Sequence, residues 1–305
     1  MMHSFKFGAI PFLLYVLFIA NINFAEAEIF GDGEPENGVE DKRQLLALTE
    51  VAQYQRFIGT IECADNQRGI AVLLSVKDSE NEERQPILLT AKHVFPGASD
   101  GELEDCQYLM AGKPWQAQPL TSRYAKSGSF SVADHQLDRS RAIEFSQDWT
   151  LVKLSAWKNW SNSAFSLPVE QAARHLEHSA AEQDIRRPQH AFFIGFDEAR
   201  GGFMVDLDCE FGEPEPDSLV GDIGHLVWDN CDSIGGSSGG VLFELSGSEP
   251  RIKGIRVGNL FDSEVYPEGP DPGDRFDLRA NLNLSRTFDQ EILDAIKLLV
   301  SPSSG

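Results

Sequence analysis

The chain has 305 residues, and 48 acidic against 26 basic side chains give it a net charge of -22 at pH 7. This charge argues against nucleic acid or an anionic membrane surface as a partner, because both would be repelled. The length is enough for one large domain or for two small barrels around a common cleft.

Residues 1–27 have the pattern of a secretory signal peptide. Lys6 supplies the positive start, Ile10–Ala20 an apolar core too short to span a bilayer, and Ala25-Glu26-Ala27 a small-residue cleavage site. We therefore expect the mature chain to begin near Glu28, with an uncleaved anchor as the alternative.

Residues 28–56 form an acidic segment with two interpretations. A propeptide cut after Arg43 or Arg56 is one. The other, which we favour, is an ordered extension lying over the body of the protein. The apolar residues with roughly helical spacing that support it are Leu45, Leu46, Leu48 and Val51.

From Phe57 the pattern changes to short strands separated by polar turns, which suggests an antiparallel barrel. The expected strands are 57–62, 69–76, 86–90, 106–110, 149–154, 191–196, 203–211, 225–229, 240–245 and 251–257, with 278–282 as a further candidate. Helical spacing predicts an inserted surface helix within 155–184 and a terminal helix over 287–300.

Ser238 is the candidate nucleophile, because Gly-Gly-Ser-Ser-Gly-Gly lets the backbone turn sharply without crowding an approaching carbonyl. A serine hydroxyl needs a base and a group that orients the base. His93 stands at the rim of a predicted buried strand, and Asp148 stands just before another. His135 with Asp138 is a competing pair, but it lies in a polar loop, and His225 is expected to be structural.

These segments, in the order His, Asp, Ser, resemble the chymotrypsin-fold serine peptidases. Thr90–His93 looks like that family's Thr-Ala-Ala-His, Asp148–Val152 like its Asp-Ile-Ala-Leu-Leu, and Gly236–Gly240 like its Gly-Asp-Ser-Gly-Gly. The resemblance covers about residues 58–300. It implies an all-β fold of two antiparallel six-stranded barrels, at about 57–155 and 185–285 within a 57–305 domain, with a catalytic cleft between them and a C-terminal helix.

The resemblance also implies roles. His93, Asp148 and Ser238 would be the catalytic triad, and the amides of Gly236 and Ser238 the oxyanion hole. It implies a secreted or periplasmic monomer that acts on protein or peptide substrates, needs no cofactor or metal, and keeps no stable membrane association after signal cleavage. Ser237 replaces the aspartate that receives a new amino terminus in trypsin-like enzymes, which favours the secreted bacterial glutamyl-endopeptidase branch.

Specificity is the least determined property. Asp232-Ser233 looks like the base of the trypsin pocket and favours Arg or Lys on the acyl side of the scissile bond. Gly254–Gly258 resembles the Gly-Ile-His-x-Gly strand of glutamyl endopeptidases, with Arg256 at the histidine position. If both charges line the pocket they could neutralise each other. We favour basic residues, with glutamyl specificity as the alternative.

The four cysteines behind a signal peptide predict two disulfides. Of three possible pairings we prefer Cys63 with Cys106, which flank the His93 segment, and Cys209 with Cys231. No two cysteines have metal-ligand spacing. Two other functions remain as alternatives: a catalytically silent binding homologue, and an esterase with a Gly-x-Ser-x-Gly elbow, which would need a histidine after Ser238 that the sequence lacks.

Overall fold

The computed structural model describes residues 41–63, 66–77, 84–95, 106–111, 117–120, 126–129, 142–154, 167–172, 188–214, 218, 224–244, 251–262, 264–267, 270 and 274–300. The predicted signal peptide, the pair His135 and Asp138, and most of the predicted inserted helix lie outside these ranges. No helix in the described part of the chain has the length and apolarity to cross a membrane.

The N-terminal half is a sheet whose strand order is β6-β5-β2-β3-β4-β8-β7, with β9 paired to β3. All pairs are antiparallel except β3 with β9, an exception to the predicted antiparallel pattern. Its strands are β2 (Ile58–Cys63), β3 (Asn66–Lys77), β4 (Arg84–Thr90), β5 (Cys106–Met110), β6 (Ala117–Pro119), β7 (Lys126–Ser127), β8 (Thr150–Lys153) and β9 (Leu167–Pro168).

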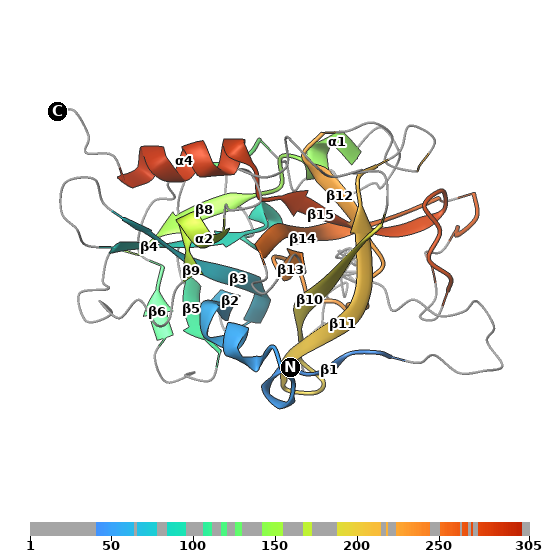
Figure 1. Cartoon of the computed structure of the whole chain (residues 1–305), viewed down its shortest axis with the longest axis horizontal. Helices are drawn as coiled ribbons and strands as arrows, with labels where there is room; N and C mark the ends of the chain where they lie inside the picture. Colours follow the sequence, from blue (N-terminus) through green and yellow to red (C-terminus); the bar gives the residue numbers. More distant parts are fainter. Residues whose placement is uncertain are drawn as a thin grey trace, which may run out of the picture.

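The C-terminal half is a closed barrel (Figure 1). Its strands follow the order β11-β10-β13-β14-β15-β12, and pairing of β11 with β12 closes the ring of six, while β1 (Gln44–Leu45) adds to β11 from outside. The barrel strands are β10 (Gln189–Asp197), β11 (Gly202–Gly212), β12 (Leu226–Asp229), β13 (Val241–Glu244), β14 (Arg251–Phe261) and β15 (Asn281–Thr287). One of the two predicted six-stranded barrels is therefore present, whereas the described strands of the N-terminal sheet do not close.

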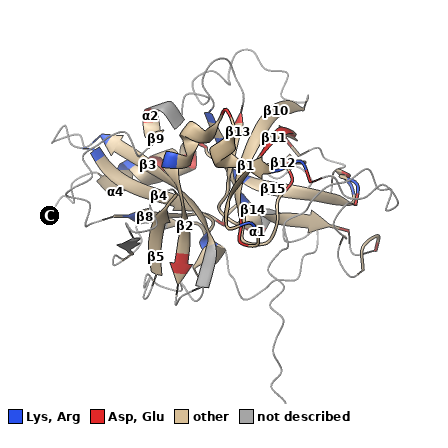
Figure 2. Cartoon of the chain, turned by 90° about the horizontal axis from the view of Figure 1, so that it is seen from below, with Lys and Arg blue, Asp and Glu red and all other residues tan. Residues whose placement is uncertain are grey.

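The helices are few. The described α-helices are α1 (Ala142–Phe145), α2 (Val169–Ala172) and α4 (Gln290–Val300), with 3-10 turns at Leu46–Leu48, Ala52–Phe57 and Lys92–Val94. The predicted C-terminal helix is confirmed as α4, which returns to the N-terminal sheet and contacts β3 (Figures 1 and 2). It begins at Gln290 because Asp289 caps it, accepting the Ile292 amide hydrogen at 3.2 Å.

One strand boundary predicted from the sequence was wrong, and one helical spacing pattern did not give an α-helix. The last strand runs over Asn281–Thr287 rather than 278–282, since its polar residues are buried and gave no apolar signal. The apolar residues after Arg43 form no α-helix: Leu46 is fully buried in a 3-10 turn, whereas Leu48 is 81% exposed, so the leucines do not share one face.

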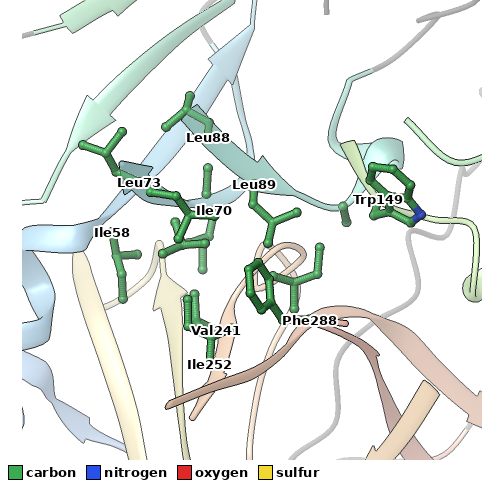
Figure 3. Close-up of a cluster of buried hydrophobic side chains, with 14 of the residues drawn as sticks. Ile58, Ile70, Leu73, Leu88, Leu89, Trp149, Val241, Ile252 and Phe288 are labelled. Carbon is green, nitrogen blue, oxygen red and sulfur yellow. The ribbon is translucent and has the colours of Figure 1, made fainter. Parts of the chain in front are cut away.

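The main apolar core joins the two halves of the chain. Figure 3 shows Ile70 and Leu89 of the N-terminal sheet close to Val241 and Phe288 of the C-terminal half, and all four are fully buried. Uncharged residues occupy most strand positions in the view from below (Figure 2). Because one core serves both sheets, residues from the two halves can be held in fixed relation at their border.

Both expected disulfides are present. Cys63 and Cys106 are cross-strand partners in β2 and β5, and Cys209 of β11 is bonded to Cys231, just after β12. The second bridge fastens the start of the 231–240 loop to the barrel, and that loop contains Ser238.

Candidate active site

His93 lies at the end of β4, where a 3-10 turn over Lys92–Val94 follows the strand. The apolar run Ile87–Leu89 is fully buried, which fixes the strand, and the turn then brings the imidazole to the edge of the sheet with a 10% exposed side chain. The sequence-based expectation of a histidine at the rim of a buried strand therefore matches its position.

Asp148 lies beside it because β4 and β8 are neighbours in register, with Thr90 opposite Thr150. Two backbone hydrogen bonds shape the turn before β8: Gln147 N–H donates to Glu144 O at 2.9 Å, and Asp148 N–H donates to Phe145 O at 3.1 Å. The Asp148 side chain is fully buried. Sheet pairing thus brings together two residues that are 55 positions apart in the sequence.

Ser238 comes from the C-terminal half, in the loop before β13. Its carbonyl accepts the Ile70 amide hydrogen at 2.8 Å, a bond that joins this loop to β3 of the other sheet. Gly239 has φ +77°, and a Cβ there would lie 2.0 Å from the Ile70 carbonyl oxygen. Glycine is therefore required at 239 for the loop to approach β3 this closely.

The three side chains are within hydrogen-bond distance. His93 Nδ1 is 2.6 Å from Asp148 Oδ2, and His93 Nε2 is 2.7 Å from Ser238 Oγ. The His93 backbone amide also donates to Asp148 Oδ1 at 3.0 Å. Both oxygens of the Asp148 carboxylate are thus hydrogen-bonded to His93, one to its backbone and one to its ring. This leaves the imidazole little freedom to rotate.

Burial alone would lower the pKa of His93, but the charge and the hydrogen bond of Asp148 outweigh it and raise the pKa above the ordinary value of 6.5. A base must be neutral to accept a proton, so any reaction that uses His93 as a base should fail as the pH falls through this raised pKa.

For a hydrolysis in which His93 is the base, we expect the acidic limb of kcat/KM against pH to have its midpoint above about 6.5, the ordinary histidine value. Hydrolysis of a peptide ester from pH 4 to 9 gives the profile. A single acidic midpoint below that value would contradict the environment described for His93.

The amides expected to form an oxyanion hole lie in the same loop. Gly236 has φ +89° and is exposed, and Ser238 is partly exposed. Within the described ranges, neither amide hydrogen donates to a protein acceptor. Two backbone donors with no acceptor in the part of the chain that the structure describes, in the same loop as a serine hydroxyl, could bind a developing oxyanion.

Ser237 lies next to the nucleophile candidate but is buried, and its hydroxyl has no hydrogen-bond partner among the described residues. The position has no carboxylate, so an amino terminus could not form the ion pair with residue 237 that the resemblance to trypsin would require.

The three specificity candidates are all buried, and the charge of Arg256 interacts with Asp232 as well as with Asp229. Arg256 donates to Asp229 Oδ1 at 2.6 Å and to Ser233 Oγ at 2.8 Å. Burial raises the pKa of Asp229, and the Arg256 charge opposes that rise. Asp229 was not predicted from the sequence, where nothing but its place at the end of a strand marks it.

Asp232 also contacts the N-terminal extension. Its Oδ2 accepts the Lys42 amide hydrogen at 3.0 Å, while its own amide donates to Asp206 Oδ2 at 2.8 Å. Arg43, which follows Lys42 in the extension, is buried and ion-paired with Asp41 at 2.7 Å and with Asp197 at 3.3 Å. The extension is thus bonded to the segment that leads to Ser238.

Comparisons with known proteins add little. No protein-family model matches the chain, and no curated protein does. The solved structures similar to this chain include two at low identity. One, at 16% identity and TM-score 0.42, covers 81% of this chain and 92% of its own; its title is "Aromatic interactions drive the coupled folding and binding of the intrinsically disordered Sesbania mosaic virus VPg protein". Kallikrein-related peptidase 10 is similar at 12% identity and TM-score 0.43, over 81% and 96%.

Proposed function

We propose that this protein is a serine endopeptidase that hydrolyses peptide bonds through an acyl-enzyme. The observation that carries the proposal is the imidazole of His93, hydrogen-bonded to Asp148 on one side and to Ser238 Oγ on the other. A hydroxyl, a base and a buried carboxylate in this sequence of contacts can activate a nucleophile without a metal or a cofactor.

In this mechanism, His93 Nε2 takes the proton from Ser238 Oγ as the oxygen attacks the peptide carbonyl. The amides of Gly236 and Ser238 stabilise the negative charge on the carbonyl oxygen. His93 then gives the proton to the leaving amine, and water repeats the sequence to release the acid. Asp148 holds the proton on Nδ1, so that Nε2 is free to accept.

We also propose that the enzyme is secreted and keeps residues 41–56. Disulfides favour an oxidising compartment, in keeping with the predicted signal peptide. Cleavage after Arg43 would require the peptide bond between Arg43 and Gln44 to enter the cleft of a protease. Arg43 is buried, however, and β1 begins at Gln44. These contacts therefore argue against a cut after Arg43, whereas Arg56, the other site that the sequence offers, is exposed.

For specificity we propose a preference for Arg or Lys on the acyl side, assigned to Asp232. Arg256 forms its ion pair with Asp229 at 2.6 Å, so Asp232 only partly offsets the charge of Arg256. Glutamyl specificity would need Arg256 to bind the substrate carboxylate, and its ion pair with Asp229 opposes that.

Replacing Asp232 with serine should lower kcat/KM for substrates with Arg or Lys by about 30-fold or more, because losing one member of a charge pair costs about 2–5 kcal/mol. A peptide library with Arg, Lys, Gln or Glu at the cleaved position measures the change, with Asp208→Ser, which removes an exposed carboxylate of the same barrel, as the control. Cleavage of glutamyl peptides by the wild type, unchanged in the variant, would support the glutamyl alternative instead.

The direct test of the proposed activity is labelling with a fluorophosphonate, which reacts only with an activated serine. The wild type should be labelled at Ser238, and Ser238→Ala should not. An unlabelled, folded wild type would favour a catalytically silent binding protein, and labelling that survives the substitution would place the nucleophile elsewhere.

A further inference from the structure

Arg286 has an unusual position for a buried arginine. It belongs to β15 of the C-terminal barrel and its side chain is fully buried, yet its Nε donates to the Ser146 carbonyl at 2.5 Å. Ser146 lies two residues before Asp148, in the turn that leads into β8. The guanidinium thus links the barrel to the turn that holds the carboxylate of the proposed triad.

The rest of the guanidinium is held by the start of α4 and the end of β15. Nη1 donates to Asp289 Oδ2 and to the Thr287 carbonyl, both at 2.7 Å, and Nη2 donates to Glu291 Oε2 at 2.6 Å. The guanidinium is planar and rigid, so these contacts fix the direction in which Nε points. The two carboxylates therefore orient the bond to Ser146 as well as neutralise the charge.

His225, Asp289 and Glu291 bring one nitrogen and two carboxylate oxygens within 4.8 Å of one another, a spacing that could suit a metal ion. Here both carboxylates already bind Arg286, and Asp289 also accepts from His225 Nδ1. A metal ion would have to compete with a fully buried arginine for the same oxygens. We therefore interpret the two carboxylates as ion-pair partners of Arg286 and not as metal ligands.

The turn is held from its other side by the N-terminal sheet itself. Gly128 N–H donates to the Trp149 carbonyl at 3.0 Å, and Lys92 Nζ donates to the Gly128 carbonyl at 2.8 Å. These bonds act on the turn after Asp148, at Trp149. The contact from Arg286 acts on the turn before Asp148, at Ser146, and comes from the barrel that also supplies Ser238.

We propose that Arg286 is a positioning residue that holds Asp148 against His93 from the opposite half of the molecule, an inference that rests on the proposed function for its catalytic consequence. The triad draws two members from one sheet and one from the other, so its geometry depends on links across the border. The contact from Arg286 to Ser146 is such a link, as is the bond from Ile70 to Ser238.

The test is Arg286→Lys, which keeps the charge near Asp289 and Glu291 but cannot bind them and Ser146 together. We expect kcat to fall by about 10- to 100-fold, since a displacement near 1 Å can cost that much. The acidic limb of kcat/KM should also move to lower pH, because a displaced Asp148 no longer favours protonated His93. The control is Glu291→Gln, which removes a charge but keeps an oxygen that can accept from Arg286 Nη2. The guanidinium therefore stays oriented and the Ser146 contact stays in place, so neither quantity should change.

A readout that needs no catalysis separates this inference from the proposed function. The His93 Nδ1 proton in the bond to Asp148 gives a low-field NMR resonance in 15N-histidine-labelled protein. We expect Arg286→Lys to shift or broaden it and Glu291→Gln to leave it unchanged. Should the wild type show the resonance but hydrolyse nothing, the proposed function fails while the positioning role is still measured.

A folded Arg286→Lys protein with the wild-type resonance and pH profile would overturn the proposal. If that variant does not fold, Arg286→Met combined with Glu291→Gln replaces it, because the pair leaves fewer buried charges unpaired. Failure of both to fold would assign Arg286 to stability alone, and would equally overturn a positioning role.

Discussion

Ser238→Ala should lower kcat for a peptide substrate by about 10⁶-fold, the loss that removal of the nucleophile causes in serine peptidases with a triad. The residual rate should still exceed that of water by about 10³- to 10⁴-fold, since substrate binding and the oxyanion donors survive. The Gly236 and Ser238 amides belong to the backbone, so the substitution leaves them in place.

The losses of kcat caused by Ser238→Ala and by other triad substitutions should not multiply. His93→Ala acts on the same proton transfer, so Ser238→Ala with His93→Ala should be no slower than either single variant. Single-turnover hydrolysis of a chromogenic peptide at high enzyme concentration measures these rates, with Ser237→Ala as the neighbouring control. Losses that multiply in the double variant would mean that the two residues do not act as one unit.

The sequence predicted the part of the site that depends on local signals. The apolar run before His93, the strand after Asp148 and the glycines around Ser238 each mark a residue within a few positions. The strands with buried apolar residues were also predicted near their observed bounds. These signals are short-range because a strand or a turn is determined largely by its own residues.

Contacts that depend on register were beyond the sequence. Asp229 pairs with Arg256 because β12, β15 and β14 are neighbours in the barrel, with Asp229 opposite Asn283 and Arg256 opposite Ser285. Strand β15 was misplaced for a related reason, since Asn283 and Ser285 are polar but fully buried. In the sequence alone, a strand with buried polar residues shows the same alternation of polar and apolar residues as a strand with one exposed face. Only its pairing with neighbouring strands distinguishes the two.

The N-terminal extension shows the same limit. Its leucine spacing predicted an ordered segment, but the contacts that hold it come from Asp197 and Asp232, far along the chain. Helical spacing therefore indicated order for the segment and gave the wrong local structure, because ion pairs and pairing with β11 determine its path.

Asp148→Asn should reduce kcat by about 10⁴-fold while leaving the fold intact. The reason lies in the two bonds that Asp148 accepts, from the His93 amide at its Oδ1 and from His93 Nδ1 at its Oδ2. Asparagine has only one oxygen to accept with. The backbone amide is always a donor, so the oxygen must face it, and the NH₂ group then faces Nδ1.

That arrangement changes the tautomer of the His93 imidazole. Facing an NH₂ donor, Nδ1 must accept, so the ring proton moves to Nε2, which can no longer take a proton from Ser238 Oγ. Steady-state hydrolysis measures the loss, and 15N shifts of His93 measure the tautomer. We also expect the variant to regain activity at high pH, where hydroxide can remove the serine proton. A fully active Asp148→Asn enzyme with its proton still on Nδ1 would show that this carboxylate has no part in the chemistry.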